Sequence, residues 1–328
     1  MHKEIEARVE RAIVEKTFPG CVIGVVHTNG ERHVLPFGNF TYDSTSPKVR
    51  EDTVYDMASV TKSIPVASLA LAFIGEGKMQ LSDRVTEYVP ELRNDHDATI
   101  EDLLTYRVQG TRLSELHVKT FEEIRTHVLE QGFTGPSGKG AYTNLPAFVL
   151  GIVLERVGGA ILPALAQQYF FEPLTMDDTT FFPHDVARIA PTEIVGGEEV
   201  HGVVHDESAR VFARARRAVG HAGLFSTAPD MLNFLGALLQ GTFPVVLDGA
   251  QKGFGWQHAE PWFMGVHASE GAFGKTGFTG TSVGVNPTRG VGFVILSNRT
   301  YPTRPVDAAS IHSAVNVFRA DIADILLR

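Results

Sequence analysis

The sequence predicts an α/β fold of the α+β kind, in which the two chain ends build one sheet and the middle of the chain is helical. Near the amino terminus, two apolar, β-branched segments flank Asn29-Gly30, a strong signal for a two-residue hairpin turn. A second pair of strand-like segments stands near the carboxyl terminus, and the segments between have apolar residues at helical spacing. We therefore predict a sheet region of residues 1–80 and 242–328, a mainly helical region of residues 81–241, and an active site in the cleft between them.

Each predicted element follows from a local pattern of apolar residues. Strands are predicted where apolar and β-branched residues run together between turn residues, and helices where apolar residues recur every three or four positions. Thr227 and Asp230, three positions apart before an apolar run, are predicted to form a capping box. The predicted strands cover residues 21–27, 32–40, 281–285 and 291–297, and the predicted helices cover residues 5–13, 100–106, 121–130, 146–157, 162–171, 229–240 and 309–327.

The composition describes an acidic globular protein. Of the 328 residues, 43% are hydrophobic and 20% are charged, which is enough apolar material for a sizeable core. The formal net charge of -9 argues against a nucleic acid or an anionic membrane as partner, so a small-molecule substrate is expected. The single cysteine, Cys21, excludes an internal disulfide and a site built from several thiolates, and we expect neither a metal nor another cofactor.

Neither a targeting signal nor a membrane span is expected. The amino terminus is charged and lacks the apolar core of a secretory signal, which indicates a cytoplasmic protein unless a signal has been removed from a periplasmic or extracellular one. The longest apolar stretch, residues 64–75, contains Pro65 and Ser68 and is shorter than the roughly 18 to 20 residues of a membrane span. No transmembrane helix is therefore predicted.

Ser59-Val60-Thr61-Lys62 begins the apolar helical run and is the first of three motifs that carry chemistry. Side chains three apart on a helix lie one above the other, with Cβ atoms about 5 to 6 Å apart, so the Lys62 amine can reach the Ser59 hydroxyl. A helix start also offers free N–H groups to a negative charge that forms beside the serine. The pattern predicts a nucleophile next to its base, although a capping serine and a solvated lysine would have the same spacing.

Tyr142-Thr143-Asn144 precedes a predicted helix and is the second motif. In an extended segment the side chains of Tyr142 and Asn144 share one face, so a phenol and an amide can enter the same cleft. A core tyrosine followed by an asparagine that caps the next helix is the alternative interpretation.

Lys275-Thr276-Gly277 lies in a glycine-rich segment and is the third motif. Glycines allow a strand backbone to approach a ligand closely and to point N–H groups at it, while the lysine adds a positive charge. Taken alone, the tripeptide is equally compatible with a turn into an edge strand.

The three motifs, in this order, resemble those of the superfamily of penicillin-binding proteins and serine β-lactamases. Tyr-x-Asn as the second motif is similar to the branch that contains class C β-lactamases, DD-peptidases and β-lactamase-related esterases. The resemblance extends over residues 18–328 and implies a β-lactamase-like fold, an antiparallel sheet flanked by helices with a helical insertion. Further segments similar to this branch are residues 55–58, 220–227, 253–256 and 296–299.

The resemblance implies a role for each polar candidate. It makes Ser59 the acylated nucleophile, Lys62 its partner, and Tyr142 the general base and acid. Asn144 would bind a substrate amide or carbonyl group and orient Lys62. A lysine accepts a proton near pH 7 only where burial or a neighbouring cation lowers its pKa, and Lys275 could be that cation. Because two lysines would also favour the phenolate, the sequence leaves open whether Lys62 or Tyr142 is the base.

The third motif is expected to bind substrate. By resemblance, Lys275, Thr276 and Gly277 contact the substrate, the first two through its carboxylate. The backbone N–H groups of Ser59 and Phe278 are expected to form the oxyanion hole, with Phe278 as a further substrate contact. Phe278 stands where many β-lactamases have a small polar residue, which adds an apolar wall and argues against strong β-lactamase activity.

These residues predict a metal-independent serine hydrolase that cleaves an ester or amide bond through an acyl-enzyme on Ser59. We rank an esterase or peptidase-like hydrolase above a dedicated β-lactamase, with a small ester, amide or β-lactam as substrate. A non-hydrolytic ligand-binding or sensor protein on the same fold is the alternative, since a fold does not settle function.

Two other groups of residues favour structural interpretations. His201 and His205 stand four apart, but the residues between them form a poor helix, so the two side chains need not share a face as metal ligands would. A loop over the cleft is the favoured interpretation of that segment. Trp256, Trp262 and Phe263 are interpreted as core residues rather than as walls of a substrate pocket.

Overall fold

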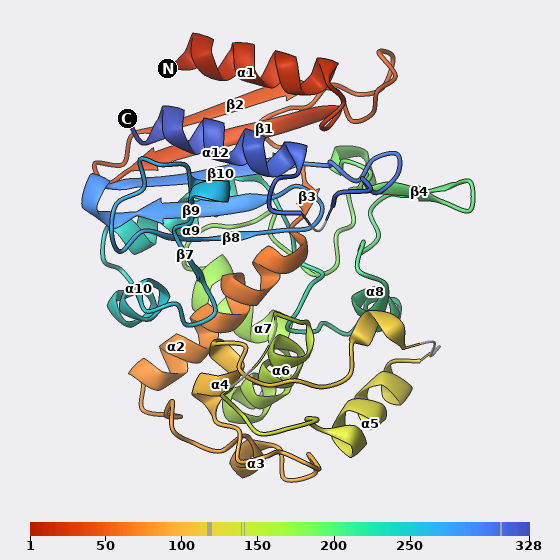
Figure 1. Ribbon diagram of the computed structural model, residues 1–328, viewed down its shortest axis with the longest axis vertical. Coiled ribbons are helices and arrows are strands. Elements are labelled where there is room, and N and C mark those ends of the chain that lie inside the picture. The colour runs from red at the N-terminus through yellow and green to blue at the C-terminus, as the bar shows by residue number, and fades with distance from the viewer. Residues whose placement is uncertain (117–119, 139, 141, 309) are drawn as a thin grey trace.

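The computed structural model describes residues 1–116, 120–138, 140, 142–308 and 310–328. Its centre is a six-stranded antiparallel sheet in the order β2-β1-β10-β9-β8-β7, so both chain ends contribute strands (Figure 1). The predicted α/β class with an antiparallel sheet is therefore confirmed. The strands of this sheet are β1 (Gly20–His27), β2 (Arg32–Gly38), β7 (Gln257–His258), β8 (Phe273–Thr276), β9 (Ser282–Asn286) and β10 (Val291–Ser297).

Helices flank the sheet and fill a second, mainly helical part of the molecule, which lies below the sheet in Figure 1. The α-helices are α1 (His2–Val14), α2 (Ser68–Gly75), α3 (Val85–Tyr88), α4 (Ile100–Leu104), α5 (Phe121–Gln131), α6 (Leu145–Gly158), α7 (Leu162–Ala166), α8 (Glu207–Arg214), α9 (Ala228–Leu239), α10 (Pro244–Gln251), α11 (Pro261–Met264) and α12 (Ala314–Leu326). Other helical turns are η1 (Ala58–Lys62), η2 (Ser63–Ala67), η3 (Leu113–Glu115), η4 (Gln167–Phe171), η5 (Val186–Arg188) and η6 (Pro287–Arg289).

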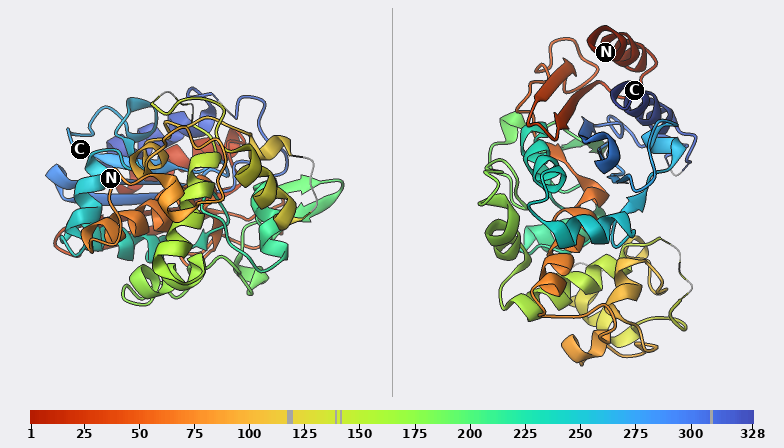
Figure 2. Two further views of the ribbon diagram at one scale, coloured as in Figure 1. Left: turned by 90° about the horizontal axis from the view of Figure 1, so that it is seen from below. Right: turned by 90° about the vertical axis from the view of Figure 1, so that its left-hand side faces the viewer.

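Alternating side chains of the central strands pack on two layers of helices. On β1, Cys21 and Ile23 point to the face that α1 and α12 cover. Val22 points to the opposite face and joins the core that contains α9. In the right-hand view of Figure 2, α1 and α12 lie side by side, with both chain termini at this end of the molecule. Arg8 Nε on α1 donates to Asp321 Oδ2 on α12 at 2.6 Å. The first and last helices therefore cover one face of the sheet together.

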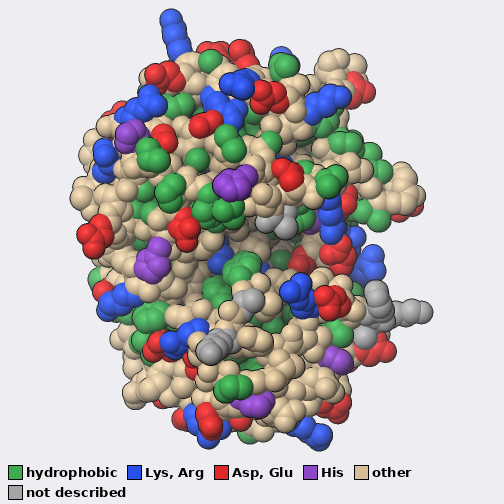
Figure 3. Space-filling model, in the orientation of Figure 1, with side chains coloured by type: hydrophobic (Ala, Val, Ile, Leu, Met, Phe, Trp, Pro, Cys, Tyr) green, Lys and Arg blue, Asp and Glu red, His purple; other side chains and the backbone are tan. Residues whose placement is uncertain are grey.

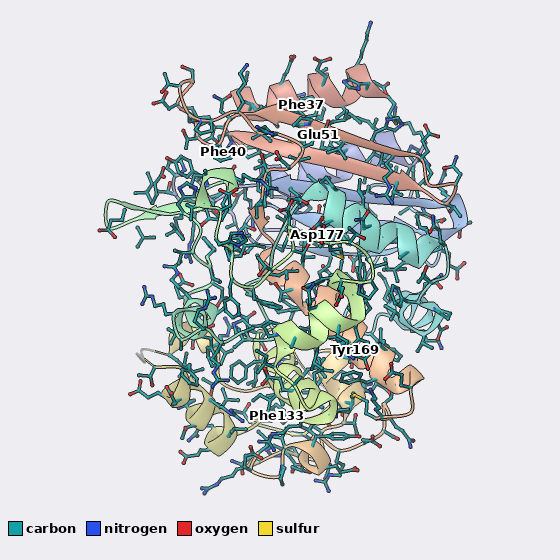
Figure 4. All side chains as sticks on the ribbon, turned by 180° about the vertical axis from the view of Figure 1, so that it is seen from behind. Phe37, Phe40, Glu51, Phe133, Tyr169 and Asp177 are labelled. Carbon is teal, nitrogen blue, oxygen red and sulfur yellow. The ribbon has the colours of Figure 1, made fainter. Side chains whose placement is uncertain are left out.

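The helical part has a dense core that continues to the far face of the sheet. Ten successive residues of α6, Leu145–Leu154, are buried, as expected of a helix that is apolar all round. Figure 4 shows this part from behind, with Tyr169 and Phe133 below the sheet strand that carries Phe37. Because the second motif directly precedes α6, this core sets the position of that motif. The predicted domain boundaries stay a prediction. Within the predicted helical region, α9 packs on the sheet, and within the predicted sheet region, α2 packs on the helices α6 and α10.

Two short two-stranded sheets have no counterpart among the predicted elements. β3 (Tyr55–Asp56) pairs with β6 (Phe225–Ser226), and β4 (Glu193–Val195) pairs with β5 (Glu198–Val200). Each strand is two or three residues long, so no period-two pattern could develop in the sequence. The first pair matters for the site, because β3 leads directly into η1.

The predicted start of the closing helix is wrong. α12 begins at Ala314, five residues after the predicted start, and Ala309 lies outside the described residues. Ile311, predicted on the buried helix face, is 51% exposed. The Ser310 carbonyl oxygen accepts a hydrogen bond from Asn316 Nδ2, which holds the preceding segment as a turn.

The predicted capping box at α9 is half present. Thr227 accepts a hydrogen bond from the Asp230 N–H, as such a cap requires. The Asp230 carboxylate, however, accepts hydrogen bonds from Thr179 and the Asp178 N–H instead of returning to the cap. A tertiary contact therefore replaces the second half of the box.

Length and composition alone mark one helical run as able to cross a membrane. In the described residues this is Ala58–Gly75, with a mean hydropathy of 1.4, and two sharply bent helix pairs would add up to two broken spans. The run is longer than the stretch 64–75 because η1, η2 and α2 follow one another. Within the fold 78% of it is buried. The expected absence of a membrane span stays a prediction.

Candidate active site

Ser59 and Lys62 lie on η1, directly after β3. The chain enters η1 through Ala58, whose φ of +46° lies in the left-handed region that residues with a side chain rarely adopt. The Asp56 carboxylate accepts hydrogen bonds from the N–H groups of Ala58 (2.8 Å) and His205 (2.7 Å), which hold this turn in place. Spacing by three along η1 then brings the serine hydroxyl and the lysine amine together.

The Lys62 amine is buried beside the Ser59 hydroxyl. Its Nζ lies 2.8 Å from Ser59 Oγ and donates to the His221 carbonyl oxygen at 2.7 Å. Only 1% of the lysine is exposed, and burial lowers its pKa to about 7, while the negative charge of Asp206 acts in the opposite direction. Near neutral pH much of Lys62 is therefore uncharged and able to accept the serine proton.

Tyr142 also reaches the serine. Although 54% of the residue is exposed, desolvation raises the pKa of Tyr142 to about 12, while the contact with Ser59 acts in the opposite direction. The Nζ atoms of Lys62 and Lys275 lie 5.5 and 4.7 Å from the centre of its ring, within cation–π distance. Tyr142 is thus a protonated phenol at neutral pH, whereas the pKa of Lys62 lies near 7.

Lys275 extends from β8 into the same cluster. Its Nζ donates to the Tyr106 hydroxyl at 3.2 Å and lies 4.7 Å from the centres of the Tyr106 and Tyr142 rings. Burial and the nearby Lys62 amine hold the pKa of Lys275 well below its ordinary value. The structure therefore brings together Ser59, Lys62, Tyr142 and Lys275. Tyr106, a fifth member, follows α4 with a φ of +57° and belongs to none of the three motifs.

Asn144 reaches the cluster through a partly buried carboxylate, that of Asp206. Its Nδ2 donates to Asp206 Oδ2 at 3.0 Å, and among the described residues it has no hydrogen bond to Lys62. Asp206 Oδ1 accepts from Ser208 Oγ at 2.7 Å and lies 3.3 Å from His221 Nε2. Burial opposes ionisation of Asp206, but these partners outweigh it and lower its pKa. Any influence of Asn144 on Lys62 therefore passes through the negative charge of Asp206.

Gly277 brings the third motif close to η1. A Cβ atom at this position would lie 2.1 Å from Thr281 Oγ1 and 2.6 Å from the Met57 carbonyl oxygen, nearer than non-bonded atoms approach. In the part of the chain that the structure describes, the N–H groups of Ser59 and Phe278 donate to no other residue. Both therefore stay available to an oxyanion.

A pocket of about 300 Å³ opens beside the serine. Figure 3 shows the molecule hollowed between the sheet part above and the helical part below. The predicted residues in its wall are Ser59, Tyr142, Thr276, Gly277 and Phe278. Further wall residues that the motifs did not indicate include Gln257, Trp262, Arg299, Ile311, Asn316 and Arg319.

Two buried arginines give the pocket a positive character. Arg299 is 6% exposed and Arg319 is 2% exposed, and neither has an ion pair with a carboxylate among the described residues. Burial lowers the pKa of Arg299 to about 10 and that of Arg319 well below its ordinary value, but both stay charged near neutral pH by virtue of the guanidinium group. An anionic substrate group would therefore be favoured here.

The aromatic and histidine residues divide between core and pocket. Trp256 is buried in the core, as interpreted from the sequence, but Trp262 lines the pocket. His205 stacks on Phe278 with ring centres 5.8 Å apart, and its Nε2 lies 3.0 Å from Glu193 Oε2. The Phe278 ring is thus an apolar wall packed against His205. Within the described ranges, no group of three or more side chains could hold a metal ion.

Comparison with known proteins identifies the family. The Beta-lactamase family model matches residues 5–316. An N-acetylmuramyl-L-alanine amidase of Bacillus subtilis is 25% identical, covering 97% of this chain and 85% of the relative. A putative D-alanyl-D-alanine carboxypeptidase of Escherichia coli is 27% identical, covering 79% and 71%. The solved structure of EstCE1, a hydrolase with promiscuous acyltransferase activity, superposes with a TM-score of 0.74 at 20% identity, covering 98% of both chains.

The chain therefore belongs to the Beta-lactamase family. The resemblance inferred from the three motifs is confirmed, and solved class C β-lactamases share the fold. The protein is accordingly a serine hydrolase for ester or amide bonds.

Proposed function

We propose that the protein cleaves an ester or amide bond of a small, carboxylate-bearing substrate through an acyl-enzyme on Ser59, with Lys62 as general base. The observation that carries the proposal is the 2.8 Å contact between the serine hydroxyl and a buried lysine with a pKa of about 7. A nucleophile within hydrogen-bond reach of an unprotonated base is the arrangement that acyl transfer requires.

In the proposed acylation, uncharged Lys62 accepts the proton of Ser59 as the serine oxygen attacks the substrate carbonyl carbon. The negative charge that forms on the carbonyl oxygen is bound by the N–H groups of Ser59 and Phe278. Tyr142, protonated and beside the serine, donates a proton to the leaving alcohol or amine and regains one from Lys62. Water then attacks the ester carbonyl by the reverse sequence and restores the serine.

The substrate class follows from the pocket wall. Arg299 and Arg319 form no ion pair with a described carboxylate, so their positive charge favours a substrate carboxylate by electrostatic attraction. Phe278, Trp262 and Ile311 add apolar surface, which favours an esterase or peptidase-like activity over a dedicated β-lactamase. The names of two relatives, a carboxypeptidase and an amidase, support the same reading.

The proposal is tested with a fluorophosphonate, which the serine oxygen attacks at phosphorus with loss of fluoride. Mass spectrometry should find one adduct, on the peptide that contains Ser59, and none on Ser59→Ala. A matched pair of esters, one neutral and one with a carboxylate in the acyl group, then tests the substrate class. The carboxylate ester should have a kcat/KM about tenfold higher, the factor that corresponds to an attraction of about 1.4 kcal/mol between its negative charge and the two guanidinium groups. Labelling without turnover of either ester would favour the non-hydrolytic alternative.

The base assignment predicts a pH dependence. Because protonated Lys62 cannot accept the serine proton, kcat/KM should fall as pH drops through about 7. The negative charge of Asp206 favours protonation of this amine. The neighbouring Lys275 has a pKa well below its ordinary value, because of its own burial and of Lys62. Asp206→Asn should therefore lower the pKa of Lys62 and move the midpoint of this limb to lower pH.

The measurement is kcat/KM for a neutral ester between pH 5 and 9. Asp230→Asn serves as the matched control, because Asp230 is likewise a hydrogen-bonded carboxylate but is bound by Thr179 at the start of α9. Its midpoint should equal that of the wild type. An Asp206→Asn midpoint that stays in place or rises would remove Lys62 as the base.

A further inference from the structure

Two buried arginines bind the backbone of the turn that carries one candidate oxyanion donor. Arg319 Nη2 donates to the carbonyl oxygens of Gly277 at 2.8 Å and Thr281 at 2.7 Å. Arg299 Nε donates to the carbonyl oxygen of Phe278 at 2.7 Å. The turn between β8 and β9 is therefore held from its carbonyl side by two guanidinium groups.

The peptide between Gly277 and Phe278 links this contact to the serine. In a trans peptide the C=O and the N–H point in opposite directions. The Gly277 carbonyl points to Arg319, so the Phe278 N–H of the same peptide points away from the guanidinium. Gly277 also lies against Met57, and the pocket beside Ser59 is lined by Gly277 and Phe278. A half-turn of this peptide would present a carbonyl oxygen to the oxyanion and remove the donor.

Burial of Arg319 is unfavourable unless its donors are satisfied. The residue is 2% exposed, and within the described residues no carboxylate pairs with it and its Nε has no hydrogen-bond partner. Its Nη1 donates to Asn316 Oδ1 at 2.6 Å, and its Nη2 is fully used by the turn. Most of its donors therefore serve the protein itself, which leaves little for a direct bond to substrate.

We propose that Arg319 is a positioning residue for the oxyanion hole: its guanidinium holds the Gly277–Phe278 peptide in the orientation that aims the Phe278 N–H at the intermediate on Ser59. Arg299 holds the next carbonyl of the same turn. The inference rests on the proposed acyl-enzyme function. It differs from a role as direct ligand of a substrate carboxylate, because an oxyanion forms on every ester, charged or neutral.

The test is Arg319→Lys, which keeps the charge but cannot hold both carbonyl oxygens with one planar group. For the matched neutral and carboxylate esters, kcat should fall by the same factor, about 10- to 100-fold, with KM little changed. A peptidyl-type boronic acid, whose boron bonds to Ser59 Oγ while Lys62 takes the proton, mimics the tetrahedral anion. Its affinity should fall by the same factor as kcat, while the affinity of the corresponding unreactive ether should not change.

Arg304→Lys is the matched control, because Arg304 also lies near the Phe278 ring, at 5.9 Å, but pairs with Glu193 and Glu207. It should remain within about twofold of wild type. Loss confined to the carboxylate ester, or boronate affinity unchanged, overturns the positioning role and leaves the acyl-enzyme proposal standing.

If Arg319→Lys does not fold, the variant Asn316→Ala is used instead. A parallel loss of kcat and boronate affinity supports the proposal, and an unchanged neutral-ester kcat overturns it. Failure of fluorophosphonate labelling on the wild type would instead refute the acyl-enzyme itself.

Discussion

Ser59→Ala and Lys62→Met are each expected to lower kcat/KM for a neutral ester by about 10³-fold, and the double variant should be little worse than either. The physical reason is that the hydroxyl and the amine act as one unit at 2.8 Å. Once one of them is removed, the other no longer contributes to catalysis, so its removal costs little more. Steady-state hydrolysis and acylation rates for the four proteins check this. Additive losses, or a Ser59→Ala variant with wild-type turnover, would contradict the assignment.

The unfolding temperature of Lys62→Met shows whether its lost activity comes from the missing amine or from unfolding. Burial depresses the pKa of Lys62 to about 7 in the folded state, so its charge disfavours folding. That cost is fully present below pH 7 and fades as pH rises toward the unfolded-state value. Lys62→Met should therefore unfold at a temperature no lower than wild type at pH 6, despite its inactivity. Lys252→Met, which removes an exposed lysine paired with Asp248, should keep wild-type activity.

Gly277→Ala is expected to lower kcat by about 10²-fold or more. An added Cβ would lie 2.1 Å from Thr281 Oγ1 and 2.6 Å from the Met57 carbonyl oxygen, so the turn must move away from η1. That movement would take the Phe278 N–H out of reach of the oxyanion, and loss of one such donor costs about 10²- to 10³-fold. Ester hydrolysis and boronate affinity should fall together.

Gly135→Ala is the matched control for the glycine variant. A Cβ atom at Gly135 would meet nothing within 4 Å, and its φ is not in the left-handed region. Activity and unfolding temperature should therefore match wild type. A Gly277→Ala enzyme with wild-type kcat would show that the close approach of the turn to η1 is not needed for the reaction.

The elements that the sequence predicted best are those whose pattern is local. The strands at 21–27 and 291–297 combine β-branched residues with nearby turns, and both appear within one residue of the predicted bounds. The closing helix was misplaced at its start because the turn before it depends on Asn316 reaching back to Ser310. The short strand β3 depends on pairing with β6, which lies far along the chain.

By itself, the sequence determined that a serine hydroxyl and a lysine amine lie side by side, because three positions on one helical turn bring Ser59 and Lys62 together whatever surrounds them. Only the tertiary structure decided how readily that amine takes up a proton. The pKa of Lys62 falls to about 7 because packing excludes water, and its second partner is a carbonyl oxygen 159 residues away, at His221. Tertiary structure also brings in Tyr106, which follows α4, and Arg319 on α12, and neither residue belongs to a motif. Hydration and long-range contacts are properties of the folded chain, and no spacing along the sequence encodes them.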